Sequence, residues 1–96
     1  MKKAYVVAVE TPHDEEMFAE YRKQVVDTIK PFAGQFVARG GNLTVLEGEW
    51  QHSRTVIIEF PTREAAEGWY KSPAYQKIIG LRQKSTNGSV VILDGI

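Results

Sequence analysis

The segment Thr55-Val56-Ile57-Ile58-Glu59-Phe60 gives the clearest β-strand signal in the chain, because β-branched and aromatic residues fill most of it. Side chains alternate between the two faces of a strand, so Val56 and Ile58 would lie on one face and Ile57 on the other. The segments Ala4–Val9 and Ser89–Asp94 are apolar on both faces in the same way. Strands of this type predict a sheet that is covered on both sides.

A long helix is expected after the first strand. Thr11 fits its N-cap and Pro12 its first residue, and apolar residues at helical spacing extend it to about Phe32. Gly34 is the expected stop signal, and Pro31 predicts an irregular last turn. This helix would bury one face against the sheet.

A hairpin is expected to follow this helix. Gln35–Arg39 and Leu43–Leu46 both have extended character and predict one second strand, bent by a bulge at Gly40-Gly41-Asn42. The polar segment 47–53 then connects this strand to the strand at Thr55–Phe60. The two strands would therefore pair as neighbours.

The second helical region is expected to be broken. Pro61-Thr62 opens one helix and Ser72-Pro73 caps another, after which Thr86-Asn87-Gly88 predicts a turn before the last strand. The element order βαββαβ predicts an α+β, ferredoxin-like fold with a four-stranded antiparallel sheet and helices on one face. At 96 residues, the chain fits one domain over residues 1–96.

The second face of this sheet would have no cover from its own chain. Its apolar side chains would form an exposed patch larger than monomers usually tolerate. A second copy of the chain is the economical cover, so we predict a homodimer that packs sheet against sheet.

Composition excludes several functional classes. Twelve Lys and Arg balance twelve Asp and Glu, which argues against nucleic acid as a partner. The absence of cysteine excludes disulfides, thiolate nucleophiles and thiolate metal sites, and two histidines are too few for a structural zinc site. No apolar stretch approaches the roughly 20 residues that span a membrane. We therefore expect a cytoplasmic protein without metal or cofactor.

Glu59 is a candidate catalytic residue, because a carboxylate between the apolar Ile58 and Phe60 is costly unless it is paired. The hairpin would place Arg39 roughly opposite Glu59. The two could form a structural ion pair, or they could line a pocket in which arginine holds an anion and the carboxylate accepts a proton. Arg82 shares a predicted helix face with Tyr75 and needs a partner if it is buried.

The polar connection before the strand at Thr55–Phe60 supplies two further candidates. His52 is the second candidate catalytic residue, and Trp50 would cover a pocket or fill the dimer seam. His13, the other histidine, fits an ordinary surface position in a first helical turn.

Segments along almost the whole chain resemble the family called domain of unknown function 1330, most specifically between Ala65 and Gln76. The resemblance implies the dimeric α+β barrel superfamily, in which two ferredoxin-like sheets form one barrel and a cleft lies between each sheet and its helices. Superfamily relatives include cofactor-independent monooxygenases and muconolactone isomerases, but the family has no assigned reaction. The matching segments are Ala4–Val7, Phe36–Gly41, Leu46–Trp50, Glu59–Pro61, Ala65–Gln76 and Leu81-Arg82.

The resemblance also selects polar positions for a site. It implies Arg39, Glu59, Ser72, Tyr75 and Arg82 as candidates, without assigning any of them a catalytic role. The resulting hypothesis is a homodimer that binds a small acidic or aromatic molecule in the cleft, with cofactor-free monooxygenase- or isomerase-like chemistry. The alternative is a non-catalytic interaction module in which Arg39 and Glu59 form a structural ion pair. The expected ligand-binding residues are Arg39, Arg82, Tyr75, Trp50 and Ser72.

Overall fold

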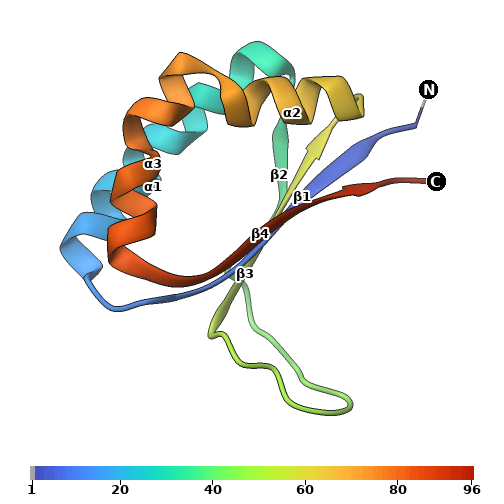
Figure 1. Ribbon diagram of the computed structural model, residues 1–96. Helices are drawn as coiled ribbons and strands as arrows, with labels where there is room; N and C mark the ends of the chain where they lie inside the picture. Colours follow the sequence, from blue (N-terminus) through green and yellow to red (C-terminus); the bar gives the residue numbers. More distant parts are fainter. Residues whose placement is uncertain (1) are drawn as a thin grey trace.

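A computed structural model describes residues 2–96 and contains one four-stranded antiparallel sheet in the order β2-β3-β1-β4 (Figure 1). This arrangement confirms the predicted α+β, ferredoxin-like fold. The elements are β1 (Ala4–Pro12), α1 (Glu15–Ile29), a 3₁₀ turn (Lys30–Phe32), β2 (Gln35–Arg39), β3 (Arg54–Phe60), α2 (Arg63–Lys71), α3 (Pro73–Ser85) and β4 (Thr86–Asp94).

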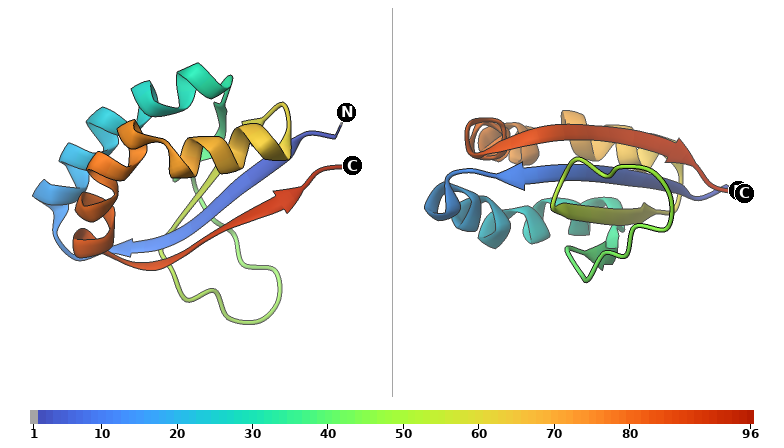
Figure 2. Two further views of the ribbon diagram at one scale, coloured as in Figure 1. Left: turned by 45° about the horizontal axis from the view of Figure 1, so that its top comes forward. Right: turned by 90° about the horizontal axis from the view of Figure 1, so that it is seen from below.

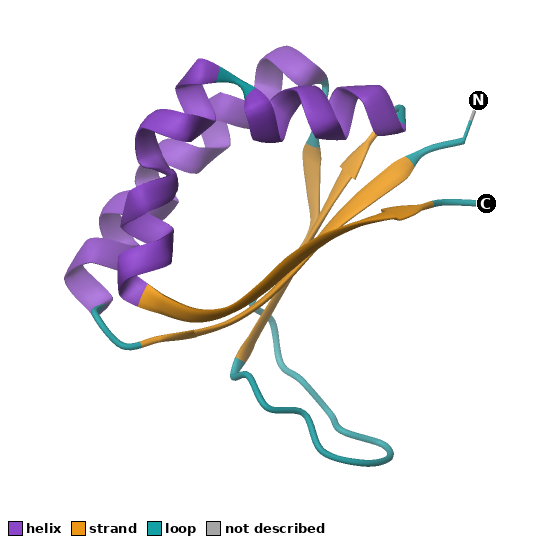
Figure 3. Cartoon of the chain, viewed as in Figure 1, coloured by secondary structure: helices purple, strands orange, loops and turns teal. Residues whose placement is uncertain are grey.

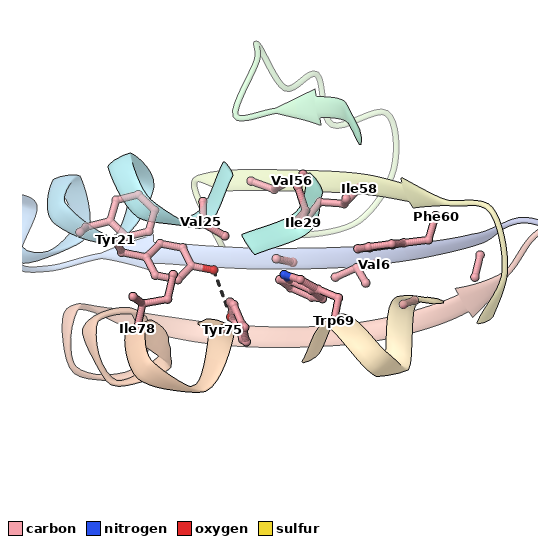
Figure 4. Packing of buried hydrophobic residues seen from close by; sticks show 14 residues of the cluster. Val6, Tyr21, Val25, Ile29, Val56, Ile58, Phe60, Trp69, Tyr75 and Ile78 are labelled. Carbon is pink, nitrogen blue, oxygen red and sulfur yellow. Dashed lines mark hydrogen bonds between the residues drawn. The ribbon is translucent and has the colours of Figure 1, made fainter. Parts of the chain in front are cut away.

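The helices all cover the same face of the sheet, and the sheet curves beneath them (Figures 2 and 3). Alternate residues of β1 and β3 point into the space between the two layers, where they meet apolar side chains from the helices. Figure 4 shows this packing. The largest fully buried side chains are Trp69, Tyr75, Phe60, Ile29 and Val6.

The opposite face of the sheet has no cover within residues 2–96. Val7, Val9 and Ile57 are only partly buried on it, and Val91 and Leu93 of β4 are 54% and 59% exposed. The predicted two-sided apolar pattern is therefore present, with one face packed and the other open.

The first helix begins later than predicted. Pro12 belongs to β1, where it pairs with Thr86 of β4 beyond the last residue that pairs with β3. Asp14 is the N-cap, and its carboxylate accepts a hydrogen bond from the Met17 backbone N–H at 3.1 Å. The prediction of Thr11 as the cap is wrong, because pairing with β4 holds Thr11 in the strand.

The predicted irregular end of this helix is confirmed as the 3₁₀ turn, but Gly34 has a different role from the one expected. The left-handed residue is Ala33, with φ 58°. At Gly34, an added Cβ would lie 2.7 Å from Cε1 of Phe60. Glycine is needed at this position for close packing rather than for backbone freedom.

The second strand is shorter than predicted. β2 ends at Arg39, and residues 40–53 form a loop that projects away from the helices (Figure 1). Leu43–Leu46 has no strand partner in the described chain, and Leu46 is 89% exposed. The shift in register falls between Phe36 and Ala38 instead of at Gly40-Gly41-Asn42.

The last strand is longer than predicted. Thr86-Asn87-Gly88 is part of β4 and pairs with β1, so the predicted turn is wrong. Gly88 lies opposite Glu10, and a Cβ on it would meet the Val9 carbonyl oxygen and the Glu10 Cα. The glycine signals a close strand approach here instead of a turn. No helix within residues 2–96 has the length and apolarity needed to cross a bilayer.

Candidate functional site

A cleft opens between the sheet and the helices, and we call it the central cleft. Its empty volume is about 430 Å³ including the solvent at its mouth, but only about 30 Å³ admits the centre of a water molecule. The cleft is therefore narrow, with room inside for about one or two ordered waters. Its aromatic lining consists of Phe18, Tyr21, Phe36, Trp69 and Tyr75.

Five charged side chains line the central cleft, and four of them are arginines. The cleft carries a formal excess of three positive charges, although the chain as a whole is neutral. Low-dielectric walls concentrate the field of such a cluster, so the cleft favours an anion. The charged residues are Glu10, Arg22, Arg39, Arg54 and Arg82.

Glu10 is the single carboxylate among these groups. It lies on the face of β1 that also carries Ala8, and it is 3% exposed. Arg54 Nε donates to its Oε1 at 3.3 Å, and Arg82 Nε donates to its Oε2 at 3.1 Å. Two arginines thus compensate one buried carboxylate, as a buried charge requires.

Arg82 occupies the deep part of the cleft. It lies two helical turns after Tyr75 on the buried face of α3 and is 9% exposed. Its Nη2 is buried, and no acceptor from residues 2–96 lies within hydrogen-bond distance. A guanidinium N–H that is removed from water without an acceptor is costly, so this atom is free to donate to an acceptor that enters the cleft.

Two tyrosines on facing helices meet beside these charged groups. The hydroxyls of Tyr21 on α1 and Tyr75 on α3 are 3.1 Å apart (Figure 4). Burial raises the pKa of Tyr21 far above its ordinary value of 10.0, and burial likewise raises the pKa of Tyr75. Both hydroxyls therefore remain protonated and able to donate hydrogen bonds at neutral pH.

Tyr75 is held in place by its neighbours. Ser72, buried between α2 and α3, accepts from the Tyr75 backbone N–H at 3.3 Å as N-cap of α3. The Tyr75 ring lies 4.3 Å from that of Trp69, whose Nε1 donates to Thr28 Oγ1 at 3.0 Å. The predicted cap at Ser72 is confirmed, and its hydroxyl is engaged in the helix junction.

Three less buried arginines form the rim of the cleft. The Arg39 guanidinium lies 4.3 Å from the Phe36 ring centre, and its Nη2 donates to the Arg22 carbonyl at 3.2 Å. Arg22 and Arg54 both lie 5.4 Å from the ring of Phe18. These cation–π contacts hold positive charge at the mouth of the cleft.

The predicted pairing of Arg39 with Glu59 is wrong. Glu59 lies opposite Gln35, whereas Arg39 lies opposite Val56 and lines the central cleft. Glu59 points to the open face of the sheet, away from the cleft, because it alternates with the buried Ile58 and Phe60. The register shift in β2, together with the early end of that strand, removes the expected alignment.

Glu59 instead belongs to a polar cluster on the open face. Gln35 Nε2 donates to its Oε2 at 3.1 Å, Tyr5 donates to its Oε1 at 3.3 Å, and Lys3 Nζ lies 3.5 Å away. The Gln35 hydrogen bond is the main cause that lowers the pKa of Glu59, with Lys3 and Tyr5 adding to it. Glu59 is thus held as a carboxylate outside the cleft.

Trp50 and His52 also lie outside the central cleft. Trp50 Nε1 donates to Thr55 Oγ1 at 3.3 Å, and His52 Nδ1 lies 3.1 Å from Thr11 Oγ1. Together with Val9 they line a separate shallow depression. Of the seven candidate residues, the structure brings Arg39, Tyr75 and Arg82 to the cleft, whereas Ser72 lies at the junction of α2 and α3 and is not part of the lining. No cluster of three potential metal ligands occurs within residues 2–96.

Sequence reasoning missed Glu10, Arg54 and Tyr21 as site residues. The predicted first strand ends at Val9, although Glu10 continues the inward alternation of Ala4, Val6 and Ala8. That alternation was the signal that could have identified Glu10 as a buried carboxylate in need of partners.

The fold and the arginine-lined cleft define a ferredoxin-like α+β protein with a recess between its two layers. A family model described as domain of unknown function DUF1330 matches residues 3–96, so the chain belongs to the DUF1330 family. A search of curated proteins finds no match.

Several solved structures share this fold at low sequence identity. A Rhodopseudomonas palustris protein of unknown function, RPA0582, has TM-score 0.79 and 16% identity over 99% of this chain and 83% of its own. SnoaB from Streptomyces nogalater, a cofactor-independent oxygenase, has TM-score 0.64 and 11% identity over 97% of this chain and 92% of its own. A dimeric ferredoxin-like protein of unknown function from Jannaschia sp. CCS1 has TM-score 0.69 and 18% identity over 96% of both chains.

Proposed function

We propose that the protein binds a small acidic or aromatic organic molecule in the central cleft, in the form of an anion. The excess of three positive charges on the cleft lining of a neutral chain carries this proposal. A bound anion would supply the charge that Glu10 alone does not balance. The aromatic lining suits the apolar part of such a molecule.

Cofactor-free chemistry of the oxygenase or isomerase type is the activity that this lining supports best. Arg82 and the neutral Tyr21–Tyr75 pair are donors that would hold an anionic substrate in place for such a reaction. The likeness to SnoaB, described as a cofactor-independent oxygenase, supports this direction at the level of fold.

The functional unit we propose is a homodimer. The open face of the sheet exposes Val91 and Leu93, and a sheet-to-sheet dimer would bury them. The Jannaschia neighbour, described as a dimeric ferredoxin-like protein, supports self-association. Each protomer would keep its own central cleft, since the helices lie on the opposite face.

A thermal-shift screen tests the proposed function. Wild-type protein is titrated with organic anions of graded size and with their neutral amides, and its melting temperature is followed. We expect the anions to raise the melting temperature while the amides do not, because a ligand that binds only the folded state stabilises it. If anions and amides raise the melting temperature equally, or if neither raises it, the result would count against an anion-binding cleft.

Two charge-removing variants locate the binding. Arg39→Met should weaken the anion-dependent shift by removing charge at the rim, whereas Lys77→Met on the exposed side of α3 is a matched control. Turnover is then sought with the anions that bind, in air and without added metal or cofactor. Binding without turnover would favour a non-catalytic interaction module over an enzyme.

A further inference from the structure

The tyrosine pair holds one more hydroxyl hydrogen than its internal bond uses. Tyr21 and Tyr75 each carry one O–H, and their mutual hydrogen bond at 3.1 Å engages only one of the two hydrogens. No other hydrogen bond reaches either hydroxyl oxygen from the described part of the chain. Since both side chains line the central cleft, the second hydrogen is a donor for a group inside it.

Arg82 supplies a second donor to the same enclosed region. Its Nε is engaged with Glu10 at 3.1 Å, but its Nη2 has no acceptor from residues 2–96. The charge of Arg82 acts on both tyrosines, because it opposes the burial that raises their pKa values. Arg82, Tyr21 and Tyr75 all line the central cleft, so the guanidinium and the hydroxyl pair border the same space.

We propose that the deep end of the central cleft is an oxyanion subsite for the carboxylate of a small aromatic acid. Arg82 Nη2 donates to this carboxylate together with the unengaged hydroxyl hydrogen of the Tyr21–Tyr75 pair. Glu10 is a positioning residue, because it fixes the Arg82 guanidinium through Nε. The subsite deepens the proposed function and rests on it.

The number of donors favours a carboxylate over a phosphate group. The deep end offers a single buried arginine and one hydroxyl hydrogen, which suit the two oxygens of a carboxylate. A phosphate presents three acceptor oxygens and carries up to two charges, which these donors would not satisfy. The enclosed part of the cleft has room for one or two waters, which suits a carboxylate but not a ring. The apolar part of the ligand would therefore lie toward the mouth, against Phe18 and Phe36 beside the three rim arginines.

Calorimetric titration with benzoate tests the subsite, with benzamide and inorganic phosphate as comparison ligands. We expect wild-type protein to bind benzoate more tightly than either of them. Arg82→Lys keeps a positive charge near Glu10 but lacks Nη2, and it should weaken benzoate binding about ten-fold or more, the value of one charge-assisted hydrogen bond. Arg63→Lys, which alters the exposed pair with Asp94, is the matched control and should leave binding unchanged.

The tyrosines provide a second measurement that is independent of folding defects at Arg82. Tyr21→Phe and Tyr75→Phe each leave one hydroxyl, whose hydrogen becomes free for the ligand. The double variant leaves none, so its loss of benzoate affinity should exceed the sum of the two single losses. The paired removal of both hydroxyls also leaves no unsatisfied partner behind, so the double variant should fold.

The failures of the two proposals are distinguishable. If wild-type protein binds no organic anion, the proposed function fails and the subsite fails with it. If benzoate binds equally well to wild type, Arg82→Lys and the double tyrosine variant, while Arg39→Met abolishes binding, the anion sits at the rim and only the subsite is wrong. Phosphate binding that exceeds benzoate binding would overturn the assignment of a carboxylate.

Discussion

Glu10 connects the sheet to the last helix through charge. Its carboxylate accepts hydrogen bonds from Arg54 on β3 and Arg82 on α3, and all three side chains are largely removed from solvent. Breaking a buried pair from one side leaves uncompensated charge behind, which costs more than the intact pair contributes. At this position the neutral amide of glutamine would keep the shape and lose the charge.

Glu10→Gln should lower the free energy of unfolding by about 2–4 kcal/mol, a little under the usual range for buried pairs because Arg54 retains some exposure. Urea denaturation measures the effect. Glu20→Gln is the control, since its pair with Lys23 at 3.7 Å is exposed and should be worth about 0.5 kcal/mol or less. Equal losses for the two variants would show that Glu10 does not carry a structural ion pair.

The Tyr21–Tyr75 pair makes the stability of the folded protein depend on pH in the alkaline range. Their pKa values are raised in the folded protein, so the protonated hydroxyls stabilise the fold below the ordinary value of 10.0. As pH rises above 10, the unfolded chain loses its tyrosine protons while the folded chain keeps them, and that stabilisation is lost. The double Phe variant removes both titrating groups.

We therefore expect the melting temperature of wild type to fall more steeply above pH 10 than that of the Tyr21→Phe/Tyr75→Phe variant. Tyrosinate absorbance, followed in parallel, should show both hydroxyls ionising together with unfolding. Identical pH profiles for the two proteins would mean that these hydroxyls ionise equally easily in the folded and unfolded chain.

The contact between β1 and β4 controls the geometry of the cleft at the level of elements. Gly88 lies opposite Glu10, and the Val9 carbonyl occupies the space that a Cβ would need. A larger residue must push β4 away from β1 where Glu10 is held. The contact between the two strands thus sets the distance from Glu10 to Arg54 and Arg82.

Gly88→Ala should destabilise the protein by about 1–3 kcal/mol through overpacking, and it should weaken binding in the cleft by displacing Glu10. Gly80→Ala is a control within α3, where no atom lies within 4 Å of the added Cβ. It should be neutral or stabilising by up to about 1 kcal/mol, because alanine favours helix. Chemical denaturation and benzoate titration of both variants give the comparison. A Gly88→Ala variant with wild-type stability and wild-type benzoate affinity would contradict the close contact between β1 and β4.

Local sequence patterns predicted the elements better than their ends and pairings. The strand at Thr55–Phe60 and the cap at Ser72 follow from local pattern and are present. The register of β2 does not follow from local pattern, because the bulge between Phe36 and Ala38 depends on tertiary packing. Because the Arg39–Glu59 pairing rested on that register, one shift removed the central pair of the predicted site.

The site itself depends on contacts between residues far apart in the chain. Arg82 was expected to need a partner if buried, but its partner Glu10 lies 72 residues away. Tyr21 and Tyr75 are separated by 54 residues and lie on different helices. Periodicity identifies which residues point inward, and only the three-dimensional packing shows which of them meet.

At the scale of the whole molecule, the sheet separates two kinds of surface. The helix side concentrates positive charge in the central cleft, and the open side exposes Val91 and Leu93 on the edge strand β4. A molecule that is neutral in total can therefore attract an anion on one side and a second copy on the other. The long loop 40–53 projects on the open side and would lie near such a copy (Figure 1).

A homodimer should have twice the chain mass of 10.8 kDa in sedimentation equilibrium at micromolar concentration. Leu93→Asp places a charge on the open face within the proposed interface, where it would lose its hydration without a partner, so this variant should sediment as a monomer. Lys77→Asp, on the exposed side of α3, should leave the mass unchanged. A wild-type mass of 10.8 kDa would show that the open face has no second copy on it, whereas an unchanged Leu93→Asp dimer would place the interface elsewhere.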